Sequence, residues 1–150
     1  MNQGGIDFTN IAFLMGVADQ FDGRAALSED IDGDGRMDLL IVEDRWKDGQ
    51  TLHIYRNTLE TNHQWIGVRL REEPGKPSPV GAKIRVIGKD RSQVATLAAG
   101  ETIHGQHSLQ RHFGLGNTAR VEAIEVIWVG GKTARIEKPA VGKYHSVLHP

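Results

Sequence analysis

The chain has 150 residues and a net charge of −1, with 39% hydrophobic residues, 25% charged residues and 18 glycines, which is the composition of a globular and loop-rich protein. It contains no cysteine, which excludes disulfides, thiolate metal sites and cysteine nucleophiles. No stretch approaches the roughly 18 apolar residues of a membrane span, so we expect no membrane insertion.

Short runs of β-branched and apolar residues, separated by glycine pairs and turn dipeptides, predict an all-β chain. We expect strands at residues 25–29, 37–42, 52–56, 66–70, 82–87, 93–98, 108–113, 124–129, 134–137 and 145–148. One segment, residues 10–17, has a pattern that predicts a short helix.

The two halves of the chain differ in how their strands would be buried. Along residues 37–42 apolar side chains occupy both faces, as in a propeller blade that is covered by neighbouring sheets. Farther along, Ile66, Val68 and Leu70 share one face of their strand, which is typical of a sandwich or barrel. The predicted fold is therefore a propeller-blade-like antiparallel repeat followed by a β-sandwich or barrel-like domain.

The charge is divided in the same way. Residues 1–62 hold five Lys or Arg against twelve Asp or Glu, a net of −7, whereas residues 63–150 hold 13 against seven, a net of +6. This asymmetry predicts two units, which we place at residues 1–61 and 62–150. The basic residues of the second unit are dispersed, so the sequence predicts no nucleic-acid partner.

A run of carboxylates is the strongest functional signal. Asp30, Asp32, Asp34 and Asp38 occupy positions 1, 3, 5 and 9 of one short segment, with glycine at position 6. These carboxylates would repel one another unless a hard cation accepted their oxygens. Calcium accepts about six to eight oxygen ligands in a flexible geometry. We therefore predict a Ca²⁺ site formed by these four side chains and the backbone carbonyl of Arg36.

This run has two alternatives to the predicted site: an EF-hand and an acidic turn without an ion. An EF-hand requires a glutamate at position 12 and flanking helices, but Ile41 stands there within an expected strand. The alternative is an acidic turn between two strands without an ion, because Asp and Gly are favoured in turns. Such a turn does not require Asp38.

Family resemblances cover most of the chain. Residues 23–57, with the acidic run and the segment Leu-His-Ile-Tyr-Arg-Asn at 52–57, resemble an FG-GAP or VCBS-type repeat. Residues 62–149 resemble an ASPIC/UnbV domain through the segments at 63–70, 81–86, 112–116 and 121–131. Such repeats form propeller blades that hold calcium in a hairpin loop, and the ASPIC/UnbV domain follows them in cartilage acidic protein and in many bacterial secreted proteins. The resemblance implies the C-terminal part of a longer secreted protein with further repeats upstream.

Histidines and tryptophans offer other candidate sites. A metal-dependent hydrolase is a further alternative, in which three histidines near Glu101 would carry catalysis: His104, His107 and His112. We favour it less, because the spacing of these histidines has no helical periodicity. Trp46 lies between basic residues and is the tryptophan that we expect to be an exposed contact, whereas Trp65 and Trp128 are expected in the core.

We therefore expect a non-catalytic, calcium-stabilised interaction module and not an enzyme. Extracellular calcium modules bind at about 10⁻⁴–10⁻³ M, so we expect an extracellular, periplasmic or cell-surface location. The expected partner is a protein or a glycan, and we also expect the first unit to pack against upstream repeats, the second unit or a second copy. A carbohydrate-binding module that uses exposed aromatic and basic residues of the second unit is the main alternative.

Overall fold

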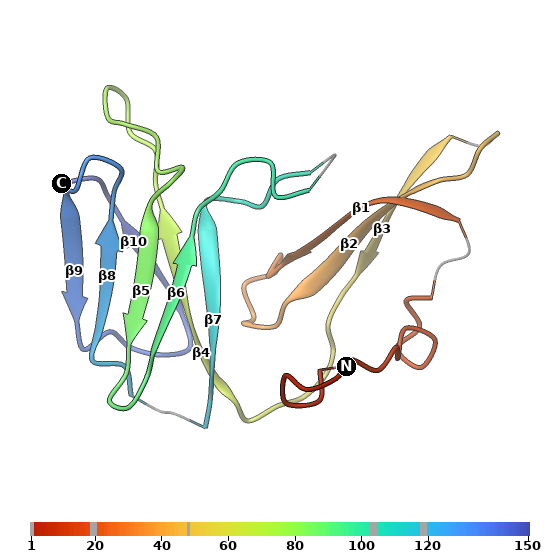
Figure 1. Ribbon diagram of the computed structural model, residues 1–150, viewed down its shortest axis with the longest axis horizontal. Helices are drawn as coiled ribbons and strands as arrows, with labels where there is room; N and C mark the ends of the chain where they lie inside the picture. The colour runs from red at the N-terminus through yellow and green to blue at the C-terminus, as the bar shows by residue number, and fades with distance from the viewer. Residues whose placement is uncertain (1, 19–20, 48, 103–104, 118–119) are drawn as a thin grey trace.

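The computed structural model describes residues 2–18, 21–47, 49–102, 105–117 and 120–150. Within these ranges the chain forms ten strands in three sheets and no helix (Figure 1). The all-β fold class is confirmed, and every predicted strand overlaps an observed one. No helix in the described ranges is long and apolar enough to cross a membrane.

Two of the sheets form a β-sandwich (Figure 1). One has the order β10-β4-β7 and the other has the order β6-β5-β8-β9. β10 runs parallel to β4, and the other neighbouring strands in these sheets are antiparallel. The strands are β4 (Gln64–Leu70), β5 (Lys83–Ile87), β6 (Ser92–Thr96), β7 (Gln110–Gly116), β8 (Ala123–Ile127), β9 (Thr133–Glu137) and β10 (Tyr144–Val147).

The hydrophobic core lies between these two sheets. The alternation along β4 buries Ile66, Val68 and Leu70, as predicted. The cluster also contains inward-facing residues of β5, β7, β8 and β10 and of adjoining loops, and Trp128 is buried within it as expected. Each fully buried aliphatic side chain contributes about 1.5–3 kcal/mol, so this core is the main source of stability in the sandwich.

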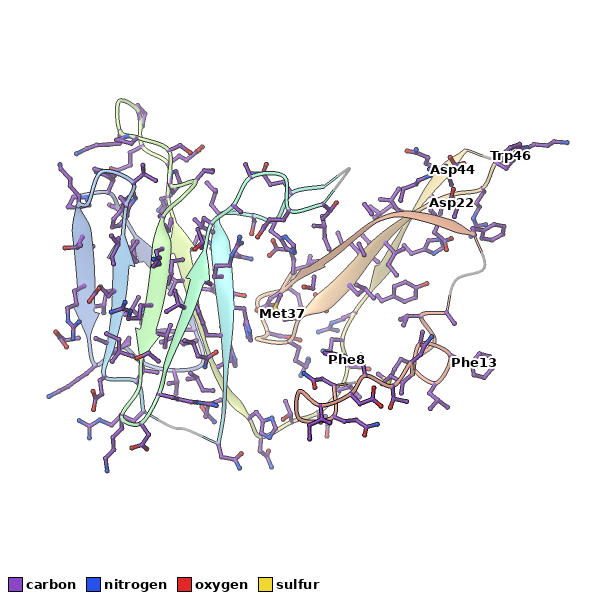
Figure 2. The ribbon with its side chains drawn as sticks, viewed as in Figure 1. Phe8, Phe13, Asp22, Met37, Asp44 and Trp46 are labelled. Atoms are coloured by element: carbon purple, nitrogen blue, oxygen red, sulfur yellow. The ribbon has the colours of Figure 1, made fainter. Side chains whose placement is uncertain are left out.

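The third sheet is an antiparallel meander of β1 (Asp22–Glu29), β2 (Asp38–Asp44) and β3 (Gln50–Tyr55). Among the described residues, none from these three strands belongs to the buried hydrophobic cluster. Leu52 and Ile54 of β3 are exposed, and Figure 2 shows Phe13 and Trp46 projecting away from the sandwich. Trp46 is 91% exposed, as expected. A small sheet needs a covered apolar face for independent stability, so this sheet depends on its contacts with other structure.

The predicted helix at residues 10–17 is wrong. The segment forms turns, with backbone hydrogen bonds from Met15 to Ile11 and from Val17 to Ala12. Gly16 has a φ of 70° and ends this turn. Nucleating a helix fixes several residues for few hydrogen bonds, and burial of Phe13 and Leu14, which remain exposed, does not offset that cost.

Gly67 occupies the centre of the sheet β10-β4-β7. It is paired with His112 of β7 on one side and with Tyr144 of β10 on the other. A Cβ built at Gly67 would lie 2.1 Å from Cδ1 of Tyr144, so the tyrosine ring lies directly over the glycine. The absence of a side chain at this position allows the ring to cross the sheet surface.

We predict that Gly67→Ala lowers the free energy of unfolding by about 1–3 kcal/mol, because the added methyl group overlaps the ring of Tyr144. The matched control is Gly114→Ala on β7, where an added Cβ would meet no atom within 4 Å. Its effect should stay within about 0.5 kcal/mol. Urea unfolding of both variants measures the difference, and equal stabilities would contradict the assigned packing.

Candidate metal centre

The loop between β1 and β2, together with the first residue of β2, contains the five predicted metal ligands. The backbone turns at Gly33 and Gly35, whose φ angles of 76° and 88° lie in the left-handed region that favours glycine. The N–H of Asp34 donates to Oδ1 of Asp32 at 3.2 Å, and the N–H of Arg36 donates to Oδ1 of Asp34 at 2.9 Å. The alternation of Asp with Gly therefore supplies both the turn geometry and the local hydrogen bonds that close it.

Three carboxylates meet at one point of this loop. Oxygens from Asp30, Asp32 and Asp38 all lie within 4.8 Å of one another. Asp30 is 5% exposed and Asp38 is 3% exposed, so two of the three are buried. In the described part of the chain, no other group of three His, Asp or Glu side chains is so arranged. Buried like charges are unfavourable unless they are paired or coordinate a metal, so this acidic trio has the chemistry of a hard-cation site.

The hydrogen bonds of the acidic trio leave one buried oxygen without a partner. Both oxygens of Asp38 accept backbone N–H groups, at 3.1 and 2.8 Å. Oδ2 of Asp30 accepts the N–H of Gly35 at 2.9 Å and the hydroxyl of Tyr144 at 3.0 Å. Oδ1 of Asp30 is buried and has no hydrogen-bond partner. A bound cation would satisfy this oxygen, so the residues present fit a calcium ion.

Arginines engage the fourth predicted carboxylate, Asp34. Its Oδ2 forms an ion pair with the guanidinium of Arg36 and lies 3.5 Å from Nη2 of Arg56. Arg56 also forms a 2.7 Å ion pair with Asp32. The backbone N–H of Arg36, with the charges of both arginines, lowers the pKa of Asp34 below its usual value against the opposing effect of desolvation. Two arginine side chains thus offset part of the negative charge of the loop, and Asp34 lies outside the acidic trio.

The loop is seated on three rings of the sandwich, which we call the aromatic platform: Trp65 of β4, His112 of β7 and Tyr144 of β10. Trp65 and His112 stack with ring centroids 5.2 Å apart, and Trp65 and Tyr144 are also 5.2 Å apart. A Cβ built at Gly35 would lie 2.0 Å from Nε1 of Trp65, so the loop backbone contacts the indole. Nε2–H of His112 donates to the carbonyl of Gly35 at 3.0 Å. Each strand of the sheet β10-β4-β7 therefore contributes one ring to the seat of the loop.

The role of the aromatic platform was not predicted from the sequence. Trp65 was expected in the core, yet this side chain is half-buried and lies against Gly35. One signal was present: Trp65 has the same parity along β4 as Gly67 and Arg69, the face opposite to the core residues. A large aromatic side chain next to a glycine on that face indicates that something covers it.

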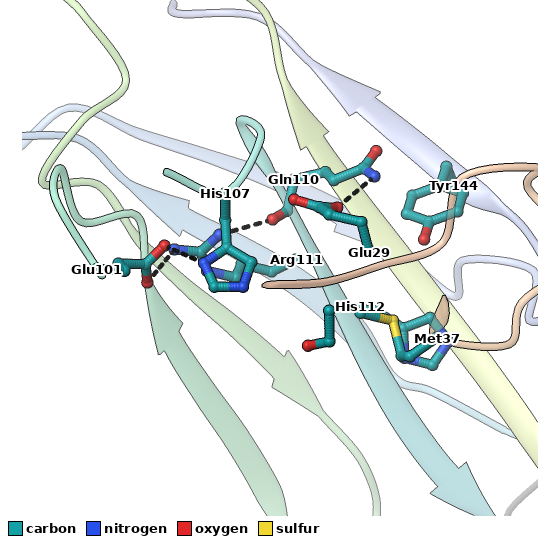
Figure 3. Close-up of a pocket in the computed structure, with 9 residues that line it drawn as sticks. Glu29, Met37, Glu101, His107, Gln110, Arg111, His112 and Tyr144 are labelled. Atoms are coloured by element: carbon teal, nitrogen blue, oxygen red, sulfur yellow. Dashed lines mark hydrogen bonds and ion pairs between the residues drawn. The ribbon is translucent and has the colours of Figure 1, made fainter. Parts of the chain in front are cut away.

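A second set of contacts lies beside the aromatic platform (Figure 3). Glu29, directly before the loop, accepts the backbone N–H of Ser108 at 2.7 Å and the side-chain amide of Gln110 at 3.0 Å. These contacts border a pocket of about 190 Å³ that Met37 and Tyr144 also line. The pocket wall contains residues of both the three-stranded sheet and the sandwich, so the two parts of the chain meet there.

His107 and His112 have separate partners in the structure. His104 lies outside the described residues. His107 forms a 2.9 Å pair through Nδ1 with Glu101, which also forms a 2.7 Å ion pair with Arg111 (Figure 3). His112 binds the loop at Gly35. Neither His107 nor His112 belongs to the group of potential metal ligands found in the described residues.

Comparison with known families identifies the second half of the chain. The family model for ASPIC and UnbV matches residues 72–150. The chain belongs to the ASPIC and UnbV family. The match spans β5 to β10, and it therefore includes His112 and Tyr144 of the aromatic platform. In this ASPIC and UnbV protein the strand with Trp65 precedes the matched region but pairs with β7 and β10. No curated protein matches the chain.

Lowering the pH should weaken the contact between the loop and the sandwich, because His112 becomes protonated. Burial lowers the pKa of His112 below its usual value of 6.5, although the hydrogen bond to Gly35 and the charge of Asp30 oppose this shift. The unfolded chain therefore binds more protons at this residue than the folded chain, and stability falls as the pH drops below about 6.5. In metal-free protein we predict a smaller loss of melting temperature in His112→Gln than in the wild type between about pH 7.5 and about pH 5.5. An equal loss in both proteins would contradict this assignment.

Proposed function

We propose that this chain is a non-catalytic, calcium-stabilised interaction module. In this proposal the segment with the acidic loop is an FG-GAP/VCBS-type repeat, and the ion fixes a structural loop and performs no chemistry. The observation that carries the proposal is the buried, unpartnered Oδ1 of Asp30 within the acidic trio. The predicted ligands are Asp30, Asp32 and Asp38, with Asp34 and the backbone carbonyl of Arg36 as further oxygen donors in the same loop.

Calcium would stabilise the folded state by mass action. A site that is present only in the folded chain contributes RT ln(1 + [Ca]/Kd), or about 1.4 kcal/mol at ten times the dissociation constant. Extracellular calcium modules have dissociation constants of about 10⁻⁴–10⁻³ M, so such a site fills outside the cell. This range supports an extracellular, periplasmic or cell-surface location.

The contacts of the histidines support a non-catalytic role. His112 donates to the carbonyl of Gly35, and Glu101 is shared between His107 and Arg111. These groups are used in holding loops together. The exposed apolar side chains of the first unit, such as Leu52, Ile54 and Trp46, support a role in contacting a protein or glycan partner or further repeats of a longer extracellular protein.

Removal of calcium should lower the melting temperature of the wild type by about 3–6 °C, as expected for the loss of about 1.4 kcal/mol. Asp30→Asn removes the charge of a buried ligand and should abolish the difference between calcium and EGTA. Asp22→Asn is the matched control, because Asp22 is an exposed β1 carboxylate outside the acidic loop, and it should keep the difference. Differential scanning fluorimetry measures all three, and identical wild-type curves in calcium and EGTA would refute the proposal.

A further inference from the structure

The geometry points to a coupling between the loop that joins β1 to β2 and the sandwich. The aromatic platform positions Asp30 for the ion, and the bound ion in turn fixes the three-stranded sheet on the sandwich. This inference rests on the proposed calcium site and adds to it. It assigns Tyr144, His112 and Trp65 as positioning residues of a metal loop that lies more than 25 residues away from each of them in the sequence.

Tyr144 controls the orientation of the Asp30 carboxylate. Its hydroxyl and the N–H of Gly35 both donate to Oδ2, and this leaves Oδ1 as the free oxygen of the pair. The tyrosine ring is itself fixed, because it lies over Gly67 and the guanidinium of Arg69 stands 5.2 Å from its centroid. Partners of this kind, which orient a metal ligand without touching the ion, are typically worth 10-fold to 100-fold in metal affinity.

Gly35 fixes the backbone of the loop on the same platform. Its carbonyl accepts from His112, its N–H donates to Asp30, and no Cβ fits beside Trp65. One glycine therefore contacts both the sandwich and the buried metal ligand. The loop conformation that aligns Asp30 depends on that contact.

Calcium affinity and docking of the loop must then be linked reciprocally. If docking on the aromatic platform strengthens calcium binding by some factor, calcium strengthens docking by the same factor. Glu29 binds Ser108 and Gln110 on the same side of the sandwich, so consecutive residues Glu29 and Asp30 both hold the end of β1 there. The ion would thus set how firmly the sheet β1-β2-β3 is held.

The first test is calcium titration of the full chain by isothermal calorimetry. Tyr144→Phe keeps the ring and removes the hydroxyl, and it should raise the calcium Kd about 10-fold. Tyr55→Phe is the matched control, since the chain has two tyrosines and Tyr55 lies on β3, and it should keep the wild-type Kd. Equal Kd values for Tyr144→Phe and wild type would overturn the coupling and leave the proposed calcium site intact. Absence of any calcium heat with the wild type would overturn the proposed function and the coupling together.

The second test separates docking from backbone strain. Gly35→Ala and Gly33→Ala place the same methyl group at left-handed φ angles in the same loop, but only the former meets Trp65. With saturating calcium, hydrogen exchange of β4 and β10 amides should slow in the wild type and in Gly33→Ala, and should not slow in Gly35→Ala. Calcium-induced protection of these strands in Gly35→Ala equal to that in wild type would overturn the coupling.

Discussion

The attachment of the loop to the sandwich depends on the interactions of one side chain, the carboxylate of Asp30. It is buried, one of its oxygens accepts two hydrogen bonds, and the other has no partner. One of those donors, Gly35, belongs to the loop and the other, Tyr144, belongs to the sandwich. A buried charge with an unsatisfied oxygen is costly, and a cation is the group that would satisfy it. In the proposed calcium site, the same side chain would link ion binding to the junction between the two parts of the chain.

The sheet β10-β4-β7 is built to accept this loop on its outer face. Its inner face supplies Ile66 and Val68 to the core, and its outer face presents one ring from each strand. Gly67 on β4 and Gly35 in the loop lack the side chains that would separate ring from backbone. The two glycines thus allow close contact between the sandwich and the loop of the sheet β1-β2-β3. That sheet supplies no residue to the described hydrophobic core. Because this sheet has exposed apolar side chains, its attachment to the sandwich is central to its order.

Local sequence patterns predicted the strands and the acidic trio, but they did not predict contacts between distant segments. The alternation along residues 66–70 predicted the buried face of β4, and the Asp spacing predicted that Asp30, Asp32 and Asp38 lie near one another. The helix at residues 10–17 was wrong because Phe13 and Leu14 remain exposed, so burial of these two side chains does not stabilise a helix. The aromatic platform was missed because it joins residue 35 to residues 65, 112 and 144, and no periodicity records such a contact.

Terbium luminescence tests the central claim most directly, because terbium occupies calcium sites and an adjacent indole sensitises its emission. The chain has three tryptophans, and Trp65 is the one that contacts the acidic loop. Excitation of tryptophan should produce terbium emission that excess calcium displaces. Trp65→Phe should remove this emission and retain a melting transition, whereas Trp46→Phe should keep the emission. Absence of sensitised emission in the wild type, or full emission in a folded Trp65→Phe variant, would contradict a metal site seated on the aromatic platform.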